Sequence, residues 1–304
     1  MKLNRRELIK SASGVLLAST AAWGQASARP RKERLHFGVQ TNAWGVPIQS
    51  YDELLHILDI LARLQYTGFE TNVRSLQPYF SQAAKCRKDF ESRHVELIAL
   101  HNGSALYDRS KVPGEIERLR RVAGVSAQMG AHYIIISDGK LPRPGGKLDL
   151  NAARVWTDSL NLLGRVVRSE GVKLCYHNHH VEFEGHPTEM SLLLRDTDPH
   201  LVWLNFDVGH VLGLIKPAAF SAEHFHRIAI YHLKDSKLTP SGKIVNVRMG
   251  TGEVNVKGVV APLLNSDWEG WLEMEEDGNY PRPLPHREAI LRHDRQYLRK
   301  ITGV

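Results

Sequence analysis

Residues 201–235 read LVWLNFDVGHVLGLIKPAAFSAEHFHRIAIYHLKD. This stretch shows most clearly the pattern from which the fold is predicted. It holds two short apolar runs, 201–207 and 228–235, and each run finishes in polar residues. Short runs rich in β-branched and aromatic side chains are typical of buried strands. The segment between them is long enough for a helix. The stretch therefore predicts a strand, a connecting segment and a second strand.

The same alternation extends over the rest of the chain. Helical patterns fill most of the gaps, notably residues 114–129, 151–169 and 286–301, and Ser50 can cap a helix that carries a broad leucine stripe. The six further predicted strands cover residues 36–41, 68–73, 96–101, 132–138, 172–179 and 270–277.

Eight strands separated by helices in about 276 residues match a single-domain (β/α)8 TIM barrel over residues 29–304, since such barrels typically need about 250 residues. An open, doubly wound sheet is the competing architecture, and it usually carries a glycine-rich phosphate loop after its first strand. Here the first strand is followed by Asn42-Ala43-Trp44-Gly45, which is no such loop. The sequence therefore favours the barrel.

Composition excludes several other classes of protein. Apolar residues make up 42% of the 304 residues and charged residues 24%, which argues against a disordered chain or a membrane bundle. Two cysteines, Cys86 and Cys175, cannot form a disulfide scaffold. The net charge is +7, of which about +3 falls in residues 1–28. The remaining surplus is too small to predict a nucleic-acid partner.

Residues 1–28 have the pattern of an export signal. A charged stretch, MKLNRRELIK, precedes an apolar run over residues 14–23 and a small-residue cleavage site, Ala26-Ser27-Ala28. Arg5-Arg6 resembles the twin-arginine signal, although an ordinary charged leader or an uncleaved anchor would share these features. We expect a periplasmic or secreted protein, exported folded, without stable membrane insertion after signal removal.

Polar side chains collect where the predicted strands end. Catalytic groups of barrel enzymes lie at the C-terminal ends of strands, and buried charge without a partner is costly. A purely structural barrel would therefore not be expected to carry this set: Gln40, Glu70, His101, Asp138, His177, His179, Asp207, His232, Lys234 and Glu275.

Three of these residues could bind a divalent metal ion. Asp207, His232 and Glu275 supply carboxylate and imidazole ligands from three different strands. Side chains alternate along a strand, so Lys234 should point inward with His232, and Glu273 inward with Glu275. A polar sugar pocket without metal and a vestigial site are the alternatives.

Several motifs together carry a resemblance to a known superfamily. They are Gly68-Phe69-Glu70, Tyr176-His177-Asn178-His179, Asn205-Phe206-Asp207-Val208-Gly209-His210, His232-Leu233-Lys234-Asp235, Gly250-Thr251-Gly252-Glu253 and residues 271–277. The chain resembles the xylose isomerase-like TIM-barrel superfamily of sugar isomerases and epimerases, which also includes inosose dehydratase and endonuclease IV.

The resemblance implies one divalent ion (manganese, zinc or cobalt) held by His177, Asp207, His232 and Glu275. Strand five departs from the epimerase pattern, which has glutamate where this chain has His177. His179 or Glu182 could take that place instead. In the epimerases two glutamates exchange a proton on opposite faces of the sugar, so the histidine puts that symmetric mechanism in doubt.

The predicted function is a metal-dependent isomerase or epimerase that abstracts a proton next to a carbonyl. The substrate would be an unphosphorylated sugar, keto-sugar or polyol, because the chain is exported and has no glycine-rich phosphate cradle. A dehydratase, a lyase or hydrolase of 3-keto-glycosides and a non-catalytic carbohydrate-binding barrel are the alternatives. A DNA-repair endonuclease is disfavoured, since it needs more metal ligands and a basic surface.

Residue roles follow from this reading. The expected catalytic groups are Glu275, Glu182, His179, Lys234 and His210. Trp44, Glu70 and His101 are expected to contact the substrate, with Trp44 offering an apolar face to a sugar ring. The partner would be a small sugar or glycoside, and a homo-oligomer is possible.

Overall fold

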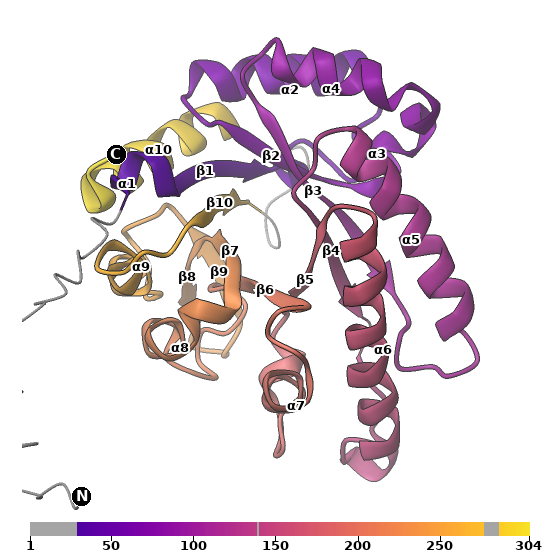
Figure 1. Cartoon of the computed structure of the whole chain (residues 1–304). Coiled ribbons are helices and arrows are strands. Elements are labelled where there is room, and N and C mark those ends of the chain that lie inside the picture. The colour runs from indigo at the N-terminus through magenta and orange to yellow at the C-terminus, as the bar shows by residue number, and fades with distance from the viewer. Residues whose placement is uncertain (1–28, 139, 277–285) are drawn as a thin grey trace, which may run out of the picture.

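The computed structural model describes residues 29–138, 140–276 and 286–304. Eight parallel strands close into a barrel in the order β1-β10-β7-β6-β5-β4-β3-β2, with helices around the outside (Figure 1). This confirms the predicted (β/α)8 architecture. The barrel strands are β1 (Leu35–Gln40), β2 (Gly68–Asn72), β3 (Glu96–Ser104), β4 (Tyr133–Asp138), β5 (Lys173–His177), β6 (Val202–Asp207), β7 (Ile228–Leu233) and β10 (Gly270–Glu275).

Side-chain caps define where the larger helices begin. Ser50 accepts a hydrogen bond from the Glu53 N–H at the start of α2, and Asp149 accepts from two N–H groups at the start of α6. The three helices predicted from periodicity correspond to α5, α6 and α10. The helices are α1 (Arg31–Arg34), α2 (Tyr51–Arg63), α3 (Val73–Leu76), α4 (Ala83–Glu91), α5 (Val112–Gln128), α6 (Leu150–Ser169), α7 (Glu189–Asp196), α8 (Pro217–His224), α9 (Val256–Leu264) and α10 (Arg287–Thr302).

Strand register brings the polar ends of the strands to one mouth of the barrel. Gln40 on β1 lies opposite Glu275 on β10 and opposite Glu70 on β2. Asp207 pairs with His232 across β6 and β7. The other end of the interior is filled with apolar groups that include Ile98, Ile135, Cys175, Ile230 and Trp271. The charged groups at the mouth therefore pack against an apolar layer inside the barrel.

Several strands end at other residues than predicted, and β3 continues to Ser104. β5 ends at His177, so His179 belongs to the following loop, and β7 ends at Leu233. The chain then forms an unpredicted antiparallel hairpin of β8 (Asp235–Leu238) and β9 (Ile244–Val247). β10 ends at Glu275. Residue 277 and the predicted signal over residues 1–28 lie outside the described residues.

The carboxylate of Asp235, at the start of the hairpin, holds the loop that follows the hairpin. This carboxylate accepts hydrogen bonds from the N–H groups of Gly250 at 2.9 Å, Gly252 at 2.8 Å and Val254 at 3.2 Å. A Cβ atom on Gly252 would lie 2.0 Å from Asp235 Oδ1, so this approach needs glycine. The Gly250-Thr251-Gly252-Glu253 motif is thus a structural loop that folds onto Asp235. Within the described ranges, no helix combines the length and apolarity that crossing a bilayer requires.

Candidate metal centre

Four buried side chains converge at the mouth of the barrel. Each of His177, Asp207, His232 and Glu275 offers one ligating atom, and these four atoms all lie within 4.8 Å of one another. They come from β5, β6, β7 and β10, so strands far apart in sequence build one cluster. We call these four residues the inner set.

Asp207 is held by the loop that follows β6. Its Oδ1 accepts hydrogen bonds from the N–H groups of Gly209 and His210, both at 2.9 Å. Asn178 Oδ1 accepts from the Asp207 N–H, and the Asn178 side-chain amide donates to the Asp207 carbonyl. These contacts fix Oδ1 toward the backbone, and Oδ2 faces Lys234.

Lys234 lies between two carboxylates of the inner set. Its Nζ is 2.7 Å from Asp207 Oδ2 and 2.8 Å from Glu275 Oε2, and the residue is 1% exposed. A Cβ on Gly209 would meet Lys234 Cγ at 2.3 Å, so glycine at this position lets the lysine stem pass. The ammonium shows that these two oxygens can share one cation.

His232 is surrounded by carboxylates. Its Nδ1 lies 3.0 Å from Glu275 Oε2, and its Nε2 lies 2.8 Å from Glu70 Oε2. Burial disfavours the imidazolium, but Glu70 and Glu275 outweigh it and raise the pKa of His232 well above its usual value. Burial likewise opposes ionisation of Glu275, yet Lys234 and His232 hold the pKa of that carboxyl well below its usual value. Glu275 is therefore a carboxylate at neutral pH.

Glu273 lies below this layer on the same face of β10, as strand alternation predicted. It is fully buried, 3.6 Å from His232 Nε2. Burial and the neighbouring Glu70 carboxylate raise the pKa of Glu273 to about 8. The site thus limits its own negative charge by keeping this carboxyl protonated at neutral pH.

His177 suits a metal ligand. It is 2% exposed, and its Nδ1 is buried without a hydrogen-bond partner among the described residues. Burial, followed by the charge of His232, lowers the pKa of His177 well below its usual value, so the ring is neutral. Two carboxylates and two imidazoles are a donor set that zinc and similar divalent ions accept. The inner set therefore fits such an ion.

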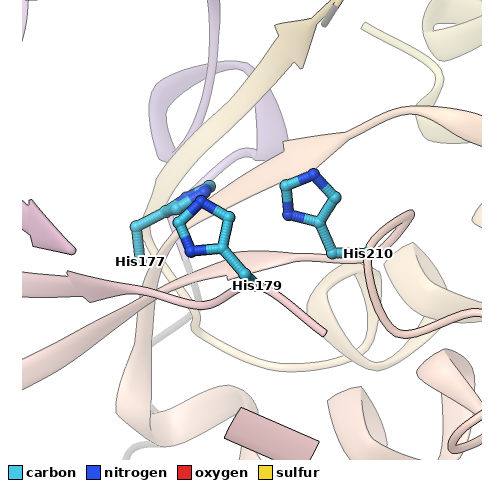
Figure 2. A group of neighbouring side chains, drawn as sticks. All are labelled: His177, His179 and His210. Carbon is cyan, nitrogen blue, oxygen red and sulfur yellow. The ribbon is translucent and has the colours of Figure 1, made fainter. Parts of the chain in front are cut away.

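The two alternatives for the strand-five ligand occupy other places. Glu182 accepts hydrogen bonds from the Tyr176 hydroxyl at 2.9 Å and the His179 N–H at 2.8 Å, and burial raises its pKa. Burial and neighbouring His210 lower the pKa of His179 to about 4. The ring of His179 lies with those of His177 and His210 in a second cluster (Figure 2). Of the three predicted alternatives, His177 is the one grouped with Asp207, His232 and Glu275.

Two of the three expected substrate residues, Glu70 and His101, lie beside this centre. Glu70 is fully buried, and its carboxylate contacts His232 and, at 2.8 Å, His101 Nδ1. His101 also lies 3.2 Å from the Ser137 hydroxyl through Nε2. Trp44 is 6% exposed, with the Arg287 guanidinium 5.4 Å from its ring centroid. Their contacts with substrate stay predictions.

The sequence did not predict the supporting roles of three polar residues. Asn178 fastens β5 to Asp207, and Glu70 orients His232, although both stand in motifs that were visible in the sequence. Asp138 was noted as a strand-end carboxylate, but it accepts a hydrogen bond from Trp156 Nε1 at 2.5 Å and another from Ser104. It therefore ties α6 to β4.

Comparisons with known proteins agree with the barrel fold. A family model described as "Xylose isomerase-like TIM barrel" matches residues 58–301. An inosose dehydratase of Clostridium botulinum (strain Alaska E43 / Type E3) is 29% identical over 245 residues, which cover 72% of this chain and 80% of the relative. Among solved structures, a D-psicose 3-epimerase in the presence of D-fructose superposes with a TM-score of 0.70 at 14% identity, covering 88% of this chain and all of that one. The IolI protein with a bound zinc atom gives a TM-score of 0.67 at 15% identity and covers 89% and 98%.

Proposed function

Because the chain belongs to the xylose isomerase-like TIM barrel family, we propose that it is a divalent-metal-dependent enzyme that removes a proton next to a carbonyl. Its substrate is an unphosphorylated sugar, keto-sugar or polyol-derived ketone. The observation that carries the proposal is the inner set, whose four buried ligating atoms lie within 4.8 Å of one another. The zinc of the IolI neighbour is further support.

His177, Asp207, His232 and Glu275 hold the ion in this proposal. When bound, the ion polarises the substrate carbonyl and so acidifies the adjacent C–H bond. Glu70 contacts His232 Nε2 and keeps the imidazole oriented, as carboxylates commonly do for metal-bound histidines. Asn178 and the loop after β6 hold Asp207.

Glu275 takes the substrate proton in this mechanism. Its carboxylate is ionised at neutral pH, and Asn42 donates to its Oε1 at 3.2 Å. The Lys234 ammonium stabilises negative charge that develops on a substrate oxygen. His179 and His210 lie next to His177, and Glu182 accepts a hydrogen bond from the His179 N–H; these three are the proposed proton-transfer groups.

Two reactions begin with this proton removal. Return of a proton to the same or the neighbouring carbon gives an epimer or an isomer. Alternatively, the electron pair of the broken C–H bond forms a C=C bond, and the next carbon loses its hydroxyl, which leaves as water after an acidic group protonates it. The second course is a dehydratase or lyase reaction. His177 favours it, since the inner set then lacks a strand-five glutamate for two-base exchange, and the C. botulinum relative is an inosose dehydratase.

The proposed location of the protein limits the classes of sugar that it can meet. We propose that residues 1–28 direct export and that the mature chain works in the periplasm or outside the cell. Phosphorylated sugars are mainly cytosolic, so the proposed substrate carries no phosphate. A 3-keto-glycoside is compatible with the same first step, because it also has a C–H bond beside a ketone.

Incubation in deuterated water tests the proposal. The metal-loaded chain is incubated with keto-sugars, inososes and 3-keto-glycosides. Deuterium incorporation at a carbon next to the carbonyl indicates isomerase or epimerase chemistry, and a new conjugated enone absorbance indicates dehydration. Glu275→Gln should lower either rate at least a hundredfold, because general-base catalysis contributes about 10²–10⁴. Sugar binding by a metal-free chain with neither signal would instead support a carbohydrate-binding barrel.

A further inference from the structure

A second group of possible metal ligands lies at the barrel mouth, outside the inner set except for one shared residue. It consists of His177 at the end of β5, His179 two residues later and His210 in the loop after β6 (Figure 2). Their ligating atoms lie within 4.8 Å of one another. We call these three residues the histidine cluster.

The spacing of the three rings matches a shared ion. Ring centroids are 4.9 Å apart for His177 and His179, 5.1 Å for His179 and His210, and 5.8 Å for His177 and His210. Three imidazoles around one tetrahedral zinc, each with a Zn–N bond of about 2.0–2.1 Å, place their ring centroids roughly 5 Å apart. The ring spacing of the cluster is therefore compatible with one shared ion.

The hydrogen bonds of two rings also suit coordination. His210 Nδ1 faces the Asn178 carbonyl at 3.3 Å and Asp207 Oδ2 at 3.5 Å, so a proton on Nδ1 places the ring's lone pair on Nε2. Metal-bound histidines typically donate their other N–H to a carbonyl or carboxylate in this way. His177 is 2% exposed and has a buried Nδ1 without a hydrogen-bond partner among the described residues. This nitrogen has one lone pair, so an ion in the histidine cluster and an ion in the inner set would use it alternately.

We propose that His177, His179 and His210 form a second binding position for a divalent cation at the barrel mouth. The preferred ion is zinc or cobalt rather than manganese, since the ligands are imidazoles without a carboxylate. His179 and His210 are partly exposed, so the cluster can be reached from solvent. Three histidines with one open position are the arrangement of a metal that can hold water or a substrate oxygen. The proposal does not rest on the proposed reaction, but an ion here would occupy His179 and His210, the proposed proton-transfer groups, and would take His177 from the inner set.

A zinc titration in a weakened inner set tests the second position. In His232→Asn/Glu275→Gln the inner set keeps two of its four ligands, while the histidine cluster is intact. We expect this chain to retain about one equivalent of zinc after equilibrium dialysis. Adding His179→Gln should weaken zinc binding at least tenfold. His180→Gln is the matched control, because His180 is exposed and outside the cluster, and it should leave zinc binding unchanged.

Two outcomes would overturn the second position: a folded His232→Asn/Glu275→Gln chain that binds no zinc, or one that binds zinc equally well with His179→Gln added. Circular dichroism checks folding, and Glu275→Gln alone replaces the background if the double variant fails to fold. X-ray absorption at the zinc edge should then show three imidazole ligands that fall to two with His179→Gln. Manganese binding by the unaltered chain reports on the inner set separately.

Discussion

Single residues at the barrel mouth balance charge that would otherwise be costly to bury. Asp207, Glu70 and Glu275 are buried carboxylates, and the described cations that face them are Lys234 and protonated His232. Glu273 adds no charge at neutral pH, because its pKa is raised to about 8. A divalent ion would enter a cluster in which two positive charges already face three carboxylates, so it has to compete with Lys234 for carboxylate oxygens.

Replacing Lys234 should reveal this competition. Lys234→Met leaves two buried carboxylates without their ammonium, so the free energy of unfolding without metal should fall by about 3–5 kcal/mol. The increase in melting temperature on adding manganese should be larger than in the unaltered chain. Urea unfolding and thermal scans measure both effects, with Lys237→Met on exposed β8 as control. Unchanged stability without metal would contradict the balance of charge described above.

Gly209 should tolerate no side chain. A Cβ there would lie 2.3 Å from Lys234 Cγ, so Gly209→Ala must displace the lysine stem. We expect a loss of about 1–3 kcal/mol of stability, the usual cost of overpacking, together with lower turnover. Gly103→Ala is the control, since a Cβ on Gly103 has open space. Equal urea midpoints for the two variants would show that the lysine does not need this glycine.

At the scale of elements, loops after the strands carry much of the site. The loop after β6 supplies the N–H groups that hold Asp207, and the loop after β5 supplies Asn178, His179 and Glu182. The β8–β9 hairpin follows β7 directly and holds the loop around Gly250 against Asp235. These loops fix the ligands that the strands bring together.

We expect Asp235 to keep the loop over residues 250–254 ordered. Asp235→Ala removes the acceptor for the N–H groups of Gly250, Gly252 and Val254, and hydrogen bonds to a charged acceptor contribute about 1.5–3 kcal/mol each. We expect faster amide hydrogen exchange over residues 250–254. Asp267→Ala changes an exposed aspartate and should leave exchange there unchanged. Protection of the loop in Asp235→Ala would refute its assigned role.

Glu189 at the start of α7 should make stability depend on pH. Burial, and after it Glu182, raise the pKa of Glu189 to about 7 despite Arg143 at 2.6 Å, whereas an unfolded glutamate titrates near 4.5. Between these values the folded chain binds the proton more tightly. The contribution of Glu189 to stability is therefore full below pH 4.5 and is lost as pH rises through 7, by about 3 kcal/mol.

The Glu189→Gln variant tests this pH dependence, because it cannot ionise. Its free energy of unfolding should decline less between pH 5 and pH 7.5 than that of the unaltered chain, as measured in urea. Glu288→Gln on α10 changes a half-exposed carboxylate and should keep the original slope. Parallel slopes for Glu189→Gln and the unaltered chain would argue against a raised pKa.

Sequence patterns predicted the strands well and the loops poorly. Runs such as Ile228–Leu233 alternate regularly with helical segments, and this alternation was enough to predict the barrel. The positions of Asp207, His232 and Glu275 at the predicted strand ends were enough to predict that they lie together. The role of the loop over residues 250–254 escaped prediction because it depends on contacts with Asp235, fifteen or more positions away in the sequence. Periodicity also could not choose between His177 and His179, since the choice depends on where β5 ends.

At the scale of the whole molecule, closure of the barrel is what assembles the inner set. His177 and Glu275 are 98 positions apart in the sequence, and the strand order places both at one mouth. A ligand that binds only the folded state adds to its stability. Ion binding should therefore couple to unfolding of the complete barrel.

Manganese should stabilise the folded chain through the inner set. At a free concentration of about 100 times Kd, the expected gain is about 2.7 kcal/mol. EDTA should reverse it, and His232→Asn/Glu275→Gln should abolish it. Differential scanning calorimetry at fixed protein concentration measures the effect. An equal manganese-induced shift in that variant would place the ion elsewhere.

Anomalous X-ray diffraction from zinc-loaded crystals tests directly whether the inner set binds a divalent ion. We expect a zinc peak at about 2.0–2.2 Å, the length of a coordinate bond, from ligating atoms of His177, Asp207, His232 and Glu275. Crystals that bind zinc with no anomalous peak touching Asp207, His232 and Glu275 would contradict it.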